Sequence, residues 1–213
     1  MATESEDHAR AERGQTRRSR EQRRAEIAEA TLRVMTRYGL HGTTVSRIAA
    51  EVGMAPQSLY NHYENQNEML LAAIDPLISM TDGWLASSSR EDPLARLHDL
   101  GKTHHSFLSD RLEGFTIPAY QFLVADPDTG IPGAFGERHR EQLRKVAAVI
   151  EEGQRRGAIR PDIDPLKAAW RLFVVAFTED LAQLMEIPEF VTEGTSVEIL
   201  DVLLKDLAPS LEE

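Results

Sequence analysis

The sequence contains no cysteine, which excludes both disulfide bonds and thiolate metal sites. No stretch approaches the ~18 consecutive apolar residues of a membrane-spanning helix, and the N-terminal run MATESEDHARAERG lacks the apolar segment of a signal peptide. A nucleophile–base pair, a glycine-rich phosphate loop and an HExxH-type metal motif are also missing. We therefore expect a cytoplasmic protein that has no membrane partner, requires no cofactor and is not an enzyme.

Charge is distributed unevenly along the 213 residues, whose net charge is −11. Residues 8–47 carry ten arginines and four glutamates, a net charge of +6, whereas residues 71–213 have a net charge of −11. A basic N-terminal segment on an acidic body is typical of a protein that binds DNA, although a solvated charged tail would have the same composition. Double-stranded DNA is therefore the expected partner of the N-terminal segment.

A helix-turn-helix pattern occupies residues 43–70. After Thr44, whose side chain can cap a helix, apolar residues recur with the spacing of one helix face. Gly53 can adopt the left-handed conformation that ends this helix, and Pro56 suits the first turn of the next one. Leu59 is placed to pack the second helix on the first. Two short helices joined in this way form a helix-turn-helix, and its second helix fits the DNA major groove.

The segment before this motif predicts a basic arm and a further helix. Residues 1–18 are polar and aperiodic, so we expect a disordered arm whose arginines follow phosphates or enter a minor groove. Ser19 and Gln22 resemble a capping box, and the apolar face that follows ends at Gly39. Residues 19–64 are thus predicted to form a three-helix DNA-binding domain.

The remaining residues, 65–213, are predicted to form a helical body without strands, so the fold class is all-α. Asn65 and Glu68 have the spacing of a cap at the start of a fourth helix. Pro76 either kinks this helix or starts a new one after a cap at Asp75. Further helices are expected over residues 93–109, 114–124 and 135–156, from residue 165 and, with a Thr195–Glu198 cap, from residue 195.

Residues 20–72 resemble the DNA-binding segment of the TetR family of bacterial transcriptional repressors. The resemblance is carried by the run T-V-x-x-I-A-x-x-V-G-x-x-x-x-S-L-Y-x-H-Y-x-N-x-x-E-x-L, with Gly53, Leu59, Tyr60, His62 and Tyr63 in register. The chain departs from the family pattern at Ala55, where many members have Ser or Thr, at Gln57, where many have Gly or Thr, and at Gln66, where many have a phosphate-contacting Lys.

The resemblance implies a helical ligand-binding and dimerisation domain after the helix-turn-helix domain. In the family, the last two long helices of each subunit form a four-helix bundle at a two-fold interface. Here these are the helix around Trp170, which is apolar nearly all round, and the leucine-rich last helix, so we expect a homodimer with Leu200 and Leu204 in its interface. Such a dimer presents two recognition helices to a pseudo-palindromic operator.

Candidate DNA contacts fall in and before the second helix of the motif. Gln57 and Ser58 are candidates for base edges, because Gln can pair bidentately with adenine and Ser serves several bases. By resemblance, Tyr60 and His62 contact phosphates, although core packing is the alternative for Tyr60. The start of the preceding helix is expected to contact phosphates as well. The predicted DNA-binding set is Thr44, Ser46, Arg47, Pro56, Gln57, Ser58, Tyr60 and His62.

Aromatic residues of the body predict a pocket for a small molecule, since members of the family bind one there. Core packing is the alternative for each of them. The excess negative charge of the body favours an apolar or cationic effector over a polyanion. A metal site at His98, His104 and His105 is disfavoured, because neighbouring histidines on a helix face different ways. The predicted ligand-binding set is Trp84, His105, Phe122, Trp170, Phe173 and Phe177.

Together these features predict a ligand-responsive, sequence-specific DNA-binding transcriptional regulator, a repressor that a small molecule releases from its operator. One alternative is a DNA-binding regulator without a small-molecule effector. The other is an enzyme in the helical body with the N-terminal domain as a DNA-targeting module.

Overall fold

The computed structural model consists of helices, and no strand occurs among residues 2–109 and 112–209, which are the residues that it describes. Within these ranges the side chains of residues 2–19, 105, 108–109 and 112–113 are not described. The all-α fold that the sequence predicts is confirmed.

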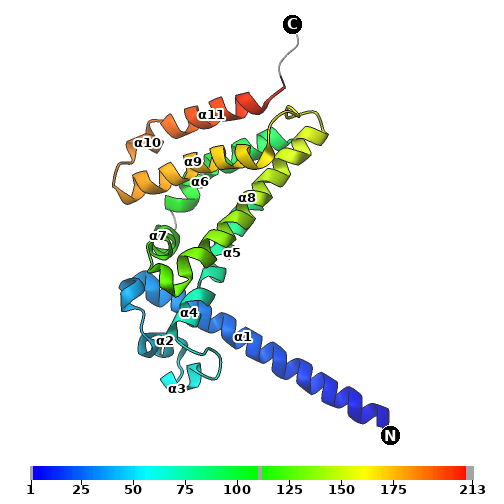
Figure 1. Ribbon diagram of the computed structural model, residues 1–213, viewed down its shortest axis with the longest axis vertical. Coiled ribbons are helices and arrows are strands. Elements are labelled where there is room, and N and C mark those ends of the chain that lie inside the picture. The colour runs from blue at the N-terminus through cyan, green and yellow to red at the C-terminus, as the bar shows by residue number, and fades with distance from the viewer. Residues whose placement is uncertain (1, 110–111, 210–213) are drawn as a thin grey trace.

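The N-terminal domain consists of α1 (Ala2–Gly42), α2 (Val45–Val52) and α3 (Pro56–Leu59), and α4 (Gln66–Ala72) leads from it into the body (Figure 1). The helical conformation of α1 is interrupted at Gly39 (φ 71°), where the sequence predicts an end. Residues 2–18, for which the sequence predicts a disordered arm, lie in α1, so Ser19 does not begin a helix. The physical reason is that Ala, Arg, Glu and Gln, which dominate this run, all have high helix propensity.

Local signals set the ends of α2 and α3 as expected. The Thr44 hydroxyl accepts a hydrogen bond from the Arg47 amide at 3.4 Å, and Gly53 ends α2 in the left-handed conformation (φ 73°). Pro56 is the first residue of α3, and Leu59 is fully buried against α1 and α2. The core of the domain comprises Ile27, Val34, Ile48, Ala49, Leu59, Tyr63 and Met69.

The connection to the body is a break between two helices. Asn65 caps α4 by accepting from the Glu68 amide at 2.9 Å. After Ala73 the chain begins α5 (Ile74–Leu85), which places Pro76 in the first turn. There its missing N–H would have had no partner in the helix anyway. A new helix therefore starts near the proline, but two residues before it and without a cap from Asp75.

The body packs its long helices at one end of the molecule. In Figure 1, α9 and α11 lie side by side at the end opposite α2 and α3, and α8 runs obliquely from this end towards the DNA-binding domain. Asp164 caps α9 by accepting from the Lys167 amide at 2.9 Å, whereas α11 begins after Gly194 (φ 87°) rather than with a Thr195 cap. The elements are α6 (Pro93–Ser109), the π-helix η1 (Leu112–Thr116), α7 (Ile117–Leu123), the 3-10 helix η2 (Pro127–Thr129), α8 (Ile131–Arg155), α9 (Pro165–Leu184), α10 (Glu189–Thr192) and α11 (Thr195–Leu207).

Candidate DNA interface and effector cavity

The helix-turn-helix presents its polar residues to solvent. Leu59 anchors α3 in the core, and this leaves Gln57 exposed and Ser58 half-buried on the outer side. Tyr60 is 45% exposed, so it is not a core residue and its hydroxyl is free to meet a phosphate. Thr44, Ser46, Arg47 and Pro56 are exposed as well.

Arg47 is held in place by the end of α1. Its Nη1 donates to the Gly42 carbonyl at 2.6 Å, and its guanidinium carbon lies 4.3 Å from the centre of the Tyr38 ring. Because a guanidinium has five N–H donors, donors remain for a phosphate. The start of α2 therefore carries a preorganised cation.

His62 differs from the exposed members of the set, because it is only half exposed and its Nδ1 is buried without a hydrogen-bond partner among the described residues. Burial and the charges of Arg20, Arg23 and Arg24 lower the pKa of its imidazole. The ring is therefore neutral at pH 7 and can offer a phosphate one N–H but no charge.

Contacts of Arg24, Tyr63 and Gln66 that the sequence did not reveal position the end of α3. The Arg24 guanidinium donates to the His62 carbonyl and, at 3.0 Å, to Glu68, and it lies 4.1 Å from the centre of the Tyr63 ring. The Tyr63 hydroxyl donates back to the Arg24 carbonyl at 2.8 Å. The first helix thus clamps the segment that follows the recognition helix. Gln66 adds a bond from its Nε2 to the Thr43 carbonyl at 2.6 Å.

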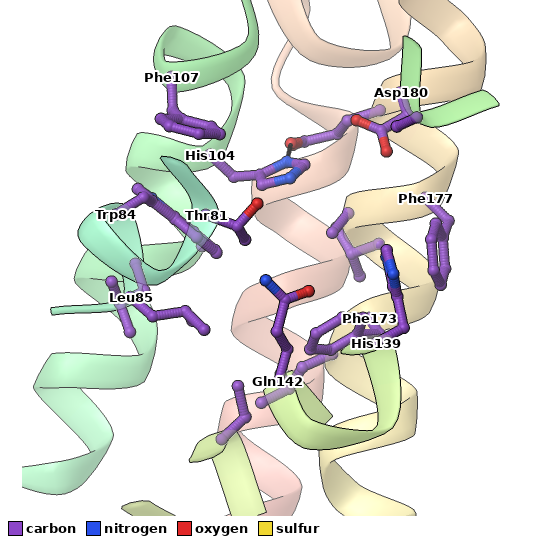
Figure 2. Close-up of a pocket in the computed structure, with 18 of the residues that line it drawn as sticks. Thr81, Trp84, Leu85, His104, Phe107, His139, Gln142, Phe173, Phe177 and Asp180 are labelled. Carbon is purple, nitrogen blue, oxygen red and sulfur yellow. Dashed lines mark hydrogen bonds and ion pairs between the residues drawn. The ribbon is translucent and has the colours of Figure 1, made fainter. Parts of the chain in front are cut away.

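The body encloses a cavity of about 90 Å³, lined mainly by apolar and aromatic side chains from α5 to α9 and α11 (Figure 2). Three of the six predicted ligand-binding residues line it, namely Trp84, Phe173 and Phe177. Several polar lining residues, among them Gln142 and Asp180, were not predicted. The signal that could have found Asp180 is an acidic pair, Glu179-Asp180, inside a helix that is otherwise almost entirely apolar.

The other three predicted residues do not line the cavity in the described structure. Phe122 is fully buried in the core cluster that includes Leu32 and Met35 of α1, and the centre of its ring lies 5.8 Å from that of Phe135. Trp170 is 49% exposed on the outer side of α9. The side chain of His105 lies outside the described residues, and its neighbour His104 faces the cavity instead.

Buried polar groups are concentrated in this cavity. The His104 Nδ1 lies 2.7 Å from the Glu179 Oε2 and so joins α6 to α9. Asp180 is 8% exposed, and the pKa of its carboxyl is raised to about 6, mainly by burial, with His104 lowering it and the nearby Glu179 adding to the rise. The Asp180 Oδ1 and the Gln142 Nε2 have no hydrogen-bond partner among the described residues. The cavity therefore offers unused hydrogen-bonding capacity on apolar walls.

The described residues give no support to a metal site. No group of three or more His, Asp or Glu side chains that could hold an ion occurs among them. His98 instead pairs with Asp201 at 3.1 Å, and His104 pairs with Glu179. Within the described ranges, no helix is long and apolar enough to cross a membrane.

A second apolar surface lies on the outer side of α9 and α11. Leu200 and Leu204, which the sequence placed in the subunit interface, are instead buried in the core, 3% and 8% exposed. Leu200 packs so closely on α6 that a Cβ at Gly101 would lie 2.4 Å from it. The apolar residues that do face outwards are Leu166, Trp170, Val174, Leu181, Ile199 and Val202, each at least 41% exposed.

The fold and the exposed α2–α3 surface define a helix-turn-helix DNA-binding protein with a helical C-terminal domain. Residues 27–73 match the family model of bacterial regulatory proteins of the tetR family. Over 142 residues the chain is 32% identical to the HTH-type transcriptional repressor SCO4008 of Streptomyces coelicolor, covering 67% of this chain and 70% of that protein. The chain belongs to the TetR family of transcriptional repressors, as its motif predicts.

Two further similarities extend over most of the chain. The HTH-type transcriptional repressor KstR2 of Mycobacterium tuberculosis is 27% identical over 150 residues, covering 67% of this chain and 72% of that protein. The structure of the transcriptional regulator FadR from Bacillus subtilis in complex with stearoyl-CoA has a TM-score of 0.66 and 17% identity, covering 85% of this chain and 98% of that chain. At this identity the second similarity concerns the fold alone.

Proposed function

We propose that this repressor binds a pseudo-palindromic operator as a homodimer and is released by a small apolar or cationic molecule in the cavity. The observation that carries the proposal is the position of α7. One side of α7 lines the cavity through Tyr120 and Leu123, and the helix also packs on α1, where the amide of Gln121 lies against Gly39. A molecule that fills the cavity therefore acts on a helix that touches the DNA-binding domain.

Two polar contacts tie α4 and α5, the helices that follow the DNA-binding domain, to the middle of the body. The Asn67 Nδ2 in α4 donates to the Thr129 carbonyl at 2.9 Å, and Arg138 in α8 pairs with Asp75 in α5 at 2.6 Å. They couple η2 and α8 to α4 and α5, through which the chain runs on from α2 and α3. An effector that prefers one arrangement of the body shifts the population towards it and changes the spacing of the two recognition helices.

The outer face of α9 and α11 supports dimer formation through these helices. Trp170, Val174 and Val202 are between 49% and 68% exposed on it, and contiguous apolar surface of this kind is rare on monomeric proteins. A second copy that covers this face buries it and makes a two-fold interface. Two-fold symmetry also matches two recognition helices to the half-sites of a palindrome.

In the proposed DNA complex, the exposed amide of Gln57 and the half-buried hydroxyl of Ser58 read base edges. Phosphates are contacted by Tyr60, by the neutral ring of His62 and by the start of α2. The residues at the start of α2 are Thr44, Ser46 and Arg47, and Pro56 fixes the entry into α3.

The effector is a compact molecule with at most one negative charge. FadR, which shares the fold, binds stearoyl-CoA, and this supports a small-molecule site in the body. The cavity of this chain, at about 90 Å³, has room for a ring or a short chain. Its wall includes a buried carboxylate, beside which a polyanion would be repelled.

The test is an electrophoretic mobility shift assay on an operator selected from random DNA, repeated with apolar, cationic and phosphorylated compounds that raise the melting temperature. We expect a two-fold symmetric site and release by an apolar or cationic compound. The variant Phe173→Ala, which removes a ring from the cavity wall, should weaken that release. Release by acyl-CoA alone would contradict the charge assignment, and release by nothing would favour a regulator without an effector.

A further inference from the structure

We propose that the cavity selects a monocationic organic amine, whose ammonium group pairs with the Asp180 carboxylate while its apolar body lies among the surrounding rings. As in the proposed function, the cavity is taken to be the effector site. The charge of the effector and the residue that recognises it are the new assignments.

Two neighbouring acids on α9 have different surroundings. Glu179 is 3% exposed and is paired with His104 at 2.7 Å. Asp180 is 8% exposed and lines the cavity, yet its Oδ1 has no hydrogen-bond partner among the described residues. Buried carboxylates in native proteins are normally paired or hydrogen-bonded. The open carboxylate therefore points to a cationic group that the ligand supplies.

No other group in the cavity wall can supply that charge. Among the described lining residues there is no arginine or lysine. The ionisable groups that face Asp180 from the surrounding elements are His104 on α6, Tyr120 on α7, His139 on α8 and Glu179 on α9. His104 is already paired with Glu179, and burial lowers the pKa of the His139 imidazole, which keeps that ring neutral. Asp180 is thus the one open charge among these groups, so a single ammonium matches the site.

The rest of the wall suits the body of an amine. Phe173 and Phe177 lie two turns and one turn before Asp180 on α9, with ring centres 5.9 Å apart (Figure 2). Trp84 lies across the cavity from them on α5 (Figure 2). Aromatic faces attract a cation and bury an apolar stem at the same time. The Gln142 Nε2 remains free to donate to an acceptor elsewhere on the ligand.

This pairing makes amine binding depend on pH. Because burial raises the pKa of Asp180 to about 6, the carboxylate is ionised at pH 7.5 and largely protonated at pH 5. A cation binds the ionised form, so affinity should rise as pH increases through 6 and then level off. The amine itself stays protonated throughout this range.

The test is calorimetric titration of the full chain with benzylamine, phenethylamine and phenylbutylamine, each compared with the alcohol of the same carbon skeleton. We expect the best amine to bind more than about tenfold tighter than its alcohol, as buried charge pairs usually do. Asp180→Asn should reduce that preference to near unity. The matched control Asp99→Asn removes the same charge from a half-exposed site on α6 outside the cavity and should keep the preference.

Three results would overturn the assignment: equal binding of amine and alcohol, a preference that survives in Asp180→Asn, or no binding by any amine of the series. Operator release is measured separately. An amine that binds through Asp180 but leaves the operator complex intact would contradict the proposed function and support the amine site. Release by another compound, with no amine binding, would support the proposed function and contradict the amine site.

Discussion

The Asp180 carboxylate should destabilise the folded protein above pH 6, and its replacement by Asn should therefore stabilise it. Asn has nearly the same shape and keeps a polar group at the site, as the protonated acid does. The comparison between the two chains thus isolates the cost of the buried negative charge.

The magnitude follows from the pKa of Asp180, which burial raises from 3.8 to about 6. This difference corresponds to about 3 kcal/mol of folding free energy. Between about pH 4 and pH 6 the folded protein binds more protons than the unfolded chain, so the stability of the unmodified protein falls as pH rises through this window. The advantage of Asp180→Asn should be complete above pH 6 and should disappear as pH approaches 4.

Thermal unfolding of both chains between pH 4.5 and pH 8, at one protein concentration and without ligand, measures this difference. At pH 7.5 the variant should melt about 6–12 °C higher, since ~1 kcal/mol moves the midpoint of a chain of this size by roughly 2–4 °C. Asp99→Asn should change stability by less than about 0.5 kcal/mol at every pH. Equal stabilities at pH 7.5, or a gap that does not close towards pH 4.5, would refute the assignment of a buried, unpaired carboxylate.

Other substitutions test the DNA surface, the dimer and the core. Gln57→Ala should relax discrimination at one position per half-site by roughly 1–3 kcal/mol, whereas Tyr60→Phe should weaken binding to all sequences alike, which mobility shifts on a set of mutated operators would distinguish. Val202→Glu should yield a folded monomer in analytical ultracentrifugation, whereas Leu200→Glu should lower the free energy of unfolding by more than about 3 kcal/mol. Gly101→Ala should cost about 1–3 kcal/mol in thermal unfolding, because the new Cβ would meet a Leu200 methyl carbon at 2.4 Å; an unchanged midpoint would mean that α6 and α11 are less tightly packed.

Short-range signals were sufficient to predict most of the DNA-binding domain. A cap such as Thr44, a left-handed Gly53 and a Pro56 at a helix start act within one turn of the chain, so a single sequence contains all that is needed to recognise them. The extent of α1 was not predictable in this way. A polar run without an apolar face has the composition of a disordered arm, but its residues also have high helix propensity. The sequence alone does not decide between the two.

The residues of the cavity depend on packing between distant helices, which a single sequence does not show. The aromatic composition of the body predicted a pocket but not its members. Phe122 and Phe173 are both aromatic residues on amphipathic segments, yet one fills the core beside α1 and the other faces the cavity. Leu200 and Val202 are likewise both aliphatic residues of α11. Leu200 is buried because it packs on α6, whereas Val202 is exposed.

Helix α9 is apolar on nearly all sides because its residues face three different environments: the core, the cavity and the outer surface. Ala168 and Ala169 pack into the core of the subunit, where small side chains let neighbouring helices approach. Phe173, Phe177 and Asp180 follow at intervals of four and three residues and face the cavity. The apolar residues that face outwards are Leu166 and, four, eight and fifteen residues after it, Trp170, Val174 and Leu181. A helix with this pattern buries only part of its apolar surface within one subunit. Its apolar residues therefore belong to the cavity wall and the uncovered outer face as well as to the core.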